Sequence, residues 1–147
     1  LEDTSTLFAT DMVSAGRIHF GSGEAFGFDS LRSEFMVSVN GRALVCDRLI
    51  ANGPDEVEAL RDLWEGANHM ATIVSVANAF PADIEASLER ALSGLPLRTF
   101  GASRLDNLIV CRILADECWA CHEAIQAAWS ELRPYVAGKP ARPIRKC

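Results

Sequence analysis

The last third of the chain decides the fold, reading LRTFGASRL at residues 97–105 and LIVCRIL at residues 108–114. These two runs predict two short strands that lead into one long amphipathic helix, which closes in Arg133-Pro134-Tyr135. We expect a single β-rich domain over residues 1–138, followed by a proline-rich basic tail over residues 139–147.

Working outward, the strongest local signal is a β-hairpin formed by residues 34–39 and 42–47. The Asn40-Gly41 pair between them accepts the two positive φ angles of a type I′ turn. With a two-residue loop, Val39 pairs with Arg42. Alternation then predicts one face with Phe35, Val37, Leu44 and Cys46 and another with Met36 and Val45. Because both faces carry apolar side chains, we expect this sheet to be covered on both sides.

The remaining elements follow from turn signals and periodicity. A short helical segment is expected after the turn at residues 52–55, through about Trp64. Residues 69–76 alternate β-branched residues and predict a strand. Pro81 is expected to start a helix that Gly94 ends. The sequence thus predicts a mainly β protein with two substantial helices, of the α+β class with stacked β-sheets.

Composition narrows the class of partner. The chain has 147 residues, 49% of them hydrophobic, and a formal net charge of -6. This charge repels nucleic acid and anionic membrane surfaces, so we expect neither as a partner. Five cysteines, an odd and unevenly spaced set, do not form a secreted disulfide framework and favour a cytoplasmic location.

One local motif suggests chemistry. The segment Cys118-Trp119-Ala120-Cys121-His122 matches the C-x-x-C-H pattern of c-type haem attachment and also contains a thioredoxin-like C-x-x-C. On a helical wheel, however, Cys118, Cys121 and His122 share a sector with the apolar residues, which favours thiols packed in the core. A redox protein, or a metal site completed by His69 or Cys111, remains the alternative.

No other catalytic pattern is present. The sequence contains no Gly-x-Ser-x-Gly, phosphate loop or His-Glu-x-x-His. The sequence therefore gives no support to nucleophilic catalysis, phosphoryl transfer or zinc-protease chemistry.

Several stretches resemble the urease accessory protein D family, called UreD or UreH. In the first half these are residues 14–17, residues 23–26 and the hairpin ending in Asp47-Arg48-Leu49. Residues 66–74 resemble the central strand of the family. The C-terminal block is the most specific, with Ser103, Leu105, Arg112, Trp129, Arg133-Pro134 and the pattern Gly138-x-Pro140-Ala141-x-Pro143-x-Arg145.

The resemblance implies a stacked or helix-like pile of strands with two helices on one side. It also implies a non-catalytic scaffold that binds apo-urease, works with UreF-type and UreG-type partners and assists nickel delivery, with nickel only in transit. The likeness covers about the C-terminal half of a family member. Either the chain is a fragment, or a separate chain supplies the N-terminal half.

Three carboxylates are candidates for guiding nickel. Glu24, Asp47 and Asp116 are acidic residues expected at strand ends or turns. Such residues also serve as caps or solvated side chains, so these positions are predictions that depend on the resemblance.

Overall fold

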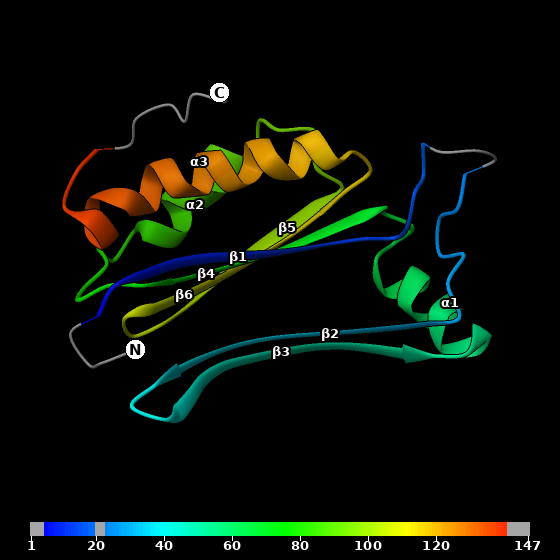
Figure 1. The fold of residues 1–147 in the computed structure, drawn as a ribbon. Coiled ribbons are helices and arrows are strands. Elements are labelled where there is room, and N and C mark those ends of the chain that lie inside the picture. Colours follow the sequence, from blue (N-terminus) through cyan, green and yellow to red (C-terminus); the bar gives the residue numbers. More distant parts are fainter. Residues whose placement is uncertain (1–4, 20–22, 141–147) are drawn as a thin grey trace, which may run out of the picture.

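The computed structural model describes residues 5–19 and 23–140. Within these residues the chain forms six strands and three helices (Figure 1). In chain order they are β1 (Leu7–Ser14), β2 (Ser30–Val39), β3 (Arg42–Asn52), α1 (Pro54–Leu63), β4 (His69–Val76), α2 (Ile84–Leu92), β5 (Thr99–Leu105), β6 (Leu108–Ala115) and α3 (Cys118–Ala137). The expected mainly β, α+β class with stacked sheets is confirmed.

The central layer is a four-stranded antiparallel sheet in the order β1-β4-β6-β5. Its inner strand β4 is buried along nearly its whole length, which explains its almost continuous apolar sequence. Helices α2 and α3 cover one face of this sheet (Figure 1). Their apolar stripes meet the sheet in the largest core cluster, which includes Ile73, Leu88, Ile109, Cys121 and Leu132.

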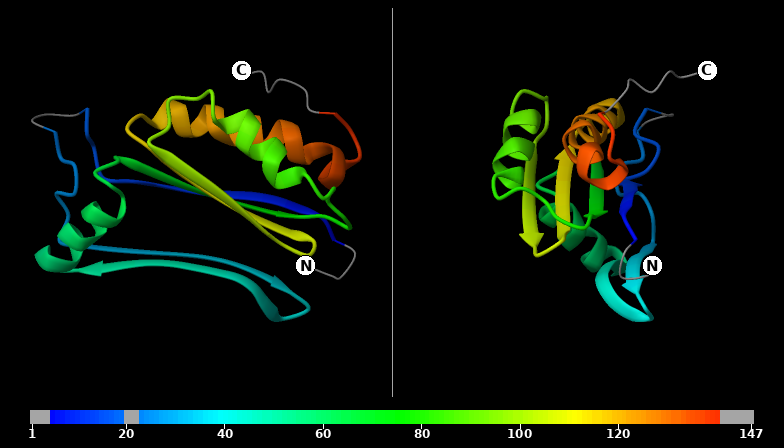
Figure 2. Two further views of the ribbon diagram at one scale, coloured as in Figure 1. Left: turned by 180° about the vertical axis from the view of Figure 1, so that it is seen from behind. Right: turned by 90° about the vertical axis from the view of Figure 1, so that its left-hand side faces the viewer.

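The hairpin β2–β3 packs against the opposite face of the four-stranded sheet (Figures 1 and 2). It contains a β-bulge that shifts the register between Val37 and Ser38, so Phe35 pairs with Asp47 and Met36 with Cys46. The predicted faces were therefore wrong beyond the bulge, because one extra residue exchanges the two faces of a strand. Cys46 is exposed, and Val45 packs in a core cluster.

The hairpin is also covered on one face only, contrary to the expectation from its sequence. Met36 and Ile50 are exposed large apolar side chains of its outer face. The four-stranded sheet is the layer that has neighbours on both sides. Apolar residues on the second face of an outer strand therefore did not require a covering layer.

The helices differ from expectation in extent. The short segment after Asn52 is a ten-residue helix, α1, which begins at Pro54 and buries Val57 and Leu60. Helix α2 begins at Ile84 and not at Pro81, whose carbonyl instead accepts a turn hydrogen bond from the Ile84 N–H at 3.2 Å. The three helices of the described residues are thus the two substantial helices expected and the short helical segment before Trp64.

The two layers differ in width. Viewed end-on, the hairpin lies beneath the β1 side of the four-stranded sheet and leaves the β5 side uncovered (Figure 2, right). Within residues 5–19 and 23–140, no helix is both long and apolar enough to cross a membrane. Most of the predicted basic tail, residues 141–147, lies outside the described residues.

Candidate functional site

A row of polar side chains crosses the space between the two sheets. Asp47 on β3 is at its centre: the Thr72 Oγ1 donates to Asp47 Oδ2 at 3.0 Å, and the Arg112 Nη2 donates to Asp47 Oδ1 at 2.8 Å. At the β1 side, the Ser33 Oγ donates to Asp11 Oδ2 at 3.4 Å. We call Asp11, Ser33, Asp47, Thr72 and Arg112 the polar row.

Strand register places these residues in line. Asp11 on β1 is the partner of Thr72 on β4, and Thr72 is the partner of Arg112 on β6. Directly opposed residues of neighbouring strands share one face, so all three side chains point towards the hairpin. Asp47 and Ser33 meet them from the opposite layer.

Burial differs along the polar row. Thr72 is 2% exposed and the Asp47 side chain is 19% exposed, whereas the Arg112 side chain is 60% exposed. The Asp47 carboxylate is therefore held from the inside by a buried hydroxyl and from the outside by a solvated guanidinium. A buried hydroxyl without an acceptor would be costly, which explains the position of Asp47.

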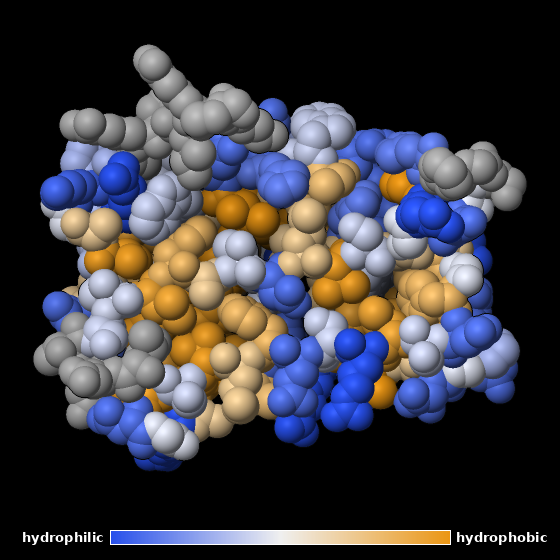
Figure 3. Space-filling view, in the orientation of Figure 1, coloured by the Kyte–Doolittle hydropathy of each residue, from blue (hydrophilic) through white to orange (hydrophobic). Residues whose placement is uncertain are grey.

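Apolar clusters lie on either side of the polar row. One, around Trp64 and Leu60, lies at the α1 end, and the other, around Val37, Val74 and Leu108, lies towards the hairpin turn. The face drawn in Figure 3 shows two hydrophobic areas separated by a hydrophilic band. The polar row thus divides the inter-sheet packing into two compartments.

Asp47 is the one predicted carboxylate in this row. Asp11 was missed, although a lone acid within the largely apolar run of β1 is a visible signal. Thr72 and Arg112 had been noted only as part of the family resemblance.

Glu24 lies elsewhere, in an exposed loop. The Arg17 Nε donates to Glu24 Oε2 at 3.2 Å, and both side chains are largely exposed. The Glu24 carbonyl oxygen also passes so close to Gly16, which has a φ of 131°, that a side chain there would collide with it. Gly16 therefore permits the close approach of the two loop segments.

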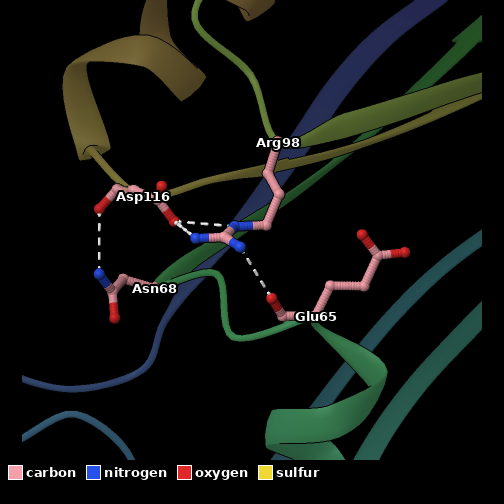
Figure 4. Close-up of polar contacts among 4 residues, drawn as sticks. All are labelled: Glu65, Asn68, Arg98 and Asp116. Carbon is pink, nitrogen blue, oxygen red and sulfur yellow. Dashed lines mark hydrogen bonds and ion pairs between the residues drawn. The ribbon is translucent and has the colours of Figure 1, made fainter.

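Asp116 lies in a third region, the link between β6 and α3 (Figure 4). The Arg98 guanidinium donates to Asp116 Oδ1 from Nη2 at 2.7 Å and from Nε at 3.0 Å, and its Nη1 donates to the Glu65 carbonyl at 3.1 Å. The Asn68 side-chain amide donates to the Asp116 carbonyl at 3.3 Å. Arg98 thereby ties together the segments that precede β4, β5 and α3.

The three predicted carboxylates are therefore not brought together, and each one pairs with an arginine. In residues 5–19 and 23–140, no group of three or more His, Cys, Asp or Glu side chains is arranged to hold a metal ion. A role for these carboxylates towards nickel stays a prediction.

The thiols of the C-x-x-C-H segment lie on the first turn of α3. Cys121 is fully buried and Cys118 partly buried, as core packing predicted, but His122 is exposed and was wrongly assigned to the core sector. Burial, and secondarily the nearby Cys118, raises the pKa of the Cys121 thiol to about 11. A reactive dithiol needs the opposite shift, so the structure gives the redox alternative no support.

His69 is buried, with 4% exposure, at the start of β4. Its Nδ1 lies 2.9 Å from the Ser14 Oγ of β1, and its Nε2 has no hydrogen-bond partner among the described residues. Burial lowers the pKa of His69. His69 is thus a core residue that makes one side-chain hydrogen bond, to Ser14.

Comparison with known proteins identifies the family. The model of the family described as "UreD urease accessory protein" matches residues 1–146 of the chain. The chain belongs to this family. UreD of Alkalilimnicola ehrlichii is 29% identical over 146 residues, covering 99% of this chain and 48% of the relative. UreD of Klebsiella aerogenes is 29% identical over 138 residues, covering 92% and 47%, respectively.

A third relative, UreD 3 of Methylorubrum populi, is 28% identical over 143 residues, covering 94% of this chain and 46% of the relative. The chain thus spans about half the length of the curated relatives that it matches. The UreD resemblance seen in the C-terminal block is confirmed, together with the membership in a family of urease accessory proteins.

Proposed function

We propose that this chain serves in the cytoplasm as a non-catalytic scaffold in urease maturation, which binds apo-urease and assists nickel delivery together with UreF-type and UreG-type proteins. The observation that carries the proposal is the family match over residues 1–146. The layered β-structure is compatible with this role, because rigid sheets present fixed surfaces to several partners at once.

Within this proposal, the polar row is the part of the interior suited to contact a hydrated cation. Asp47 and Asp11 are carboxylates on either side of Thr72, between two apolar compartments. A cation moving between the sheets would find oxygen ligands only along such a row, since apolar surface cannot replace its hydration shell.

Arg112 would act as the exchangeable counter-charge. Its guanidinium is mostly solvated, so breaking its ion pair with Asp47 costs little. A divalent cation could then take the place of Arg112 at Asp47 Oδ1. Carboxylates bind Ni²⁺ less strongly than imidazole or thiolate ligands do, and weak binding suits an ion in transit.

The test is co-expression of the protein with urease and the UreF-type and UreG-type proteins from the same source. The double variant D11N/D47N is expected to lower the nickel content and activity of the purified urease several-fold. Co-purification with apo-urease should be retained, because both substitutions lie between the sheets and preserve side-chain volume. The matched control is Glu58→Gln, which changes an exposed carboxylate of α1 that pairs with Arg61.

Two results would contradict the proposal. If the protein never co-purifies with apo-urease or a UreF-type protein, the scaffold role is wrong. If the triple variant at Glu24, Asp47 and Asp116 binds its partners and activates urease normally, the protein is an interaction module without a part in metal traffic.

A further inference from the structure

All three histidines of the chain gather at the end of the four-stranded sheet where α3 begins. His69 opens β4 and pairs with the last residue of β6, and α3 begins three residues later at Cys118. His122 lies one turn into this helix. His19 approaches from the loop after β1, with its Nε2 3.4 Å from the Glu117 Oε2. We call His19, His69 and His122 the histidine cluster.

The His69 side chain points towards the layer of helices. Along β4, Met70 and Thr72 face the hairpin, so alternation directs His69 to the opposite face, which α3 covers. Only 4% of His69 is exposed. Its Nδ1 lies 2.9 Å from the Ser14 Oγ, and its Nε2 is buried without a hydrogen-bond partner among the described residues. Both ring nitrogens carry a proton in the charged form, so Nε2 would then be a buried donor without an acceptor.

The surrounding charges decide how the cluster responds to acid. Burial lowers the pKa of His69 from its usual 6.5; Glu117 and Asp116 oppose this effect, whereas the imidazoles of the other two cluster members add to it. The Arg98 guanidinium already pairs with Asp116 at 2.7 Å. Full protonation of the cluster therefore places three positive charges near one carboxylate, that of Glu117, to which no arginine is paired among the described residues.

The first turn of α3 is poorly secured against added positive charge. Its N-cap residue Glu117 makes no side-chain capping hydrogen bond, and the turn holds no acidic residue. Because the N-terminal end of a helix carries partial positive charge, imidazolium groups destabilise it. The turn also contains the thiols of Cys118 and Cys121. Burial, and secondarily Cys118, raises the pKa of Cys121 to about 11, so this thiol supplies no negative charge.

One interaction works in the opposite direction. Protonated His19 forms an ion pair with Glu117, which favours the closed arrangement in acid. The two side chains are 73% and 46% exposed, so solvent screens this pair. His69, by contrast, is enclosed, and an enclosed charge without full hydrogen bonding is costly. The cost of charging His69 therefore outweighs the gain from the exposed pair.

We propose that the histidine cluster is a pH-sensitive switch at the start of α3. When its imidazoles gain protons, the first turn of the helix separates from the sheet, His69 becomes hydrated and the Cys121 thiol becomes accessible. The rest of the molecule stays folded, because the largest core cluster extends along α3 as far as Leu132. Imidazole changes its charge between pH 5 and 8, so the switch works within this range. The proposal does not depend on a role in urease maturation.

The test is amide hydrogen exchange of the full chain at pH 7 and pH 5, corrected for the pH dependence of the chemical exchange rate. We expect opening of the first two turns of α3 to increase at least about threefold at pH 5, while β6 is unchanged. Labelling with dithiodipyridine is the second measurement. The labelling rate of Cys121 relative to that of the exposed Cys46 should rise in parallel.

Four variants separate the switch from a merely structural contact. His69→Gln should abolish the response to acid, and His122→Gln, at an exposed position, should reduce it. Glu117→Gln should increase opening at pH 5, because it removes a carboxylate that favours the charged form of His69. The matched control is Glu123→Gln, which changes an exposed carboxylate of the same helix that is not among the charges acting on His69. It should leave the response unchanged.

Three results would overturn the proposal. The first is equal opening of the start of α3 at both pH values. The second is a parallel rise of exchange in α3 and β6, which would indicate unfolding of the whole molecule. The third is a full acid response in His69→Gln, or the same effect of Glu117→Gln and Glu123→Gln, since either would assign the response to groups outside the cluster.

Discussion

Thr72 and Asp47 belong to different sheets, and the Thr72 hydroxyl donates to the Asp47 carboxylate at 3.0 Å across the space between them. This bond connects the centre of the four-stranded sheet to the hairpin at a point where the surrounding packing is apolar. Substitutions at Thr72 and Asp47 therefore test whether this hydrogen bond orients Asp47 within the polar row.

The substitution Asp47→Ala is expected to lower the free energy of unfolding by about 1–2 kcal/mol, because it leaves the buried Thr72 hydroxyl without its acceptor. Thr72→Val in the same background should restore part of this loss, since valine of similar shape needs no acceptor. Urea unfolding of the two single variants and the double variant gives the coupling energy. Strict additivity would contradict the role given to this bond.

Arg98→Ala is expected to destabilise the protein by about 1 kcal/mol, a value reduced because both Arg98 and Asp116 are partly exposed. Arg98 holds Asp116 and the Glu65 carbonyl together, so hydrogen exchange should rise in the segments before β4 and α3. The comparison is Arg61→Ala, which removes only a surface pair with Glu58. Equal effects of the two substitutions would show that Arg98 does not act as a clamp.

The stability of the protein should fall as the pH is lowered below about 6.5. Burial lowers the pKa of His69 from its usual 6.5, so the unfolded chain binds a proton at higher pH than the folded protein does. This group therefore makes unfolding easier as the pH falls from the unfolded pKa towards the lowered folded pKa. Urea unfolding between pH 5 and 8 measures the slope.

The control for this pH dependence is His69→Gln, which removes the titrating group and retains a side chain able to bond to Ser14. The variant should show a shallower slope below pH 6.5. An unchanged slope would assign the effect to other groups.

Alkylation should distinguish the thiols. Burial raises the pKa of both Cys111 and Cys121 to about 11, so at pH 8 only about one part in a thousand of either is thiolate. With iodoacetamide, the exposed Cys46 should be labelled far sooner than these two, as measured by mass spectrometry of the native protein. Rapid labelling of Cys121 would revive the redox alternative.

Much of the local structure could be predicted from the sequence. The bounds of β4 and the Asn40-Gly41 turn agree with the patterns that predicted them, because β-branched alternation and turn chemistry act over a few residues. The family could also be identified, because the motif residues of the C-terminal block have a distinctive spacing along the sequence. The inward packing of Cys121 followed from helical periodicity alone.

The contacts between segments far apart in the sequence were decided only by the tertiary structure. The bulge at Val37 exchanged the two faces of β3 relative to the prediction. No local sequence pattern indicated this bulge. Asp47 and Arg112 are 65 residues apart in sequence, and Asp11 joins their row only through its register with Thr72 on β4. The local sequence determines the alternation of side chains between the two faces of their own strand. The partner that it meets depends on how sheets stack and strands align, and those follow from burial over the whole chain.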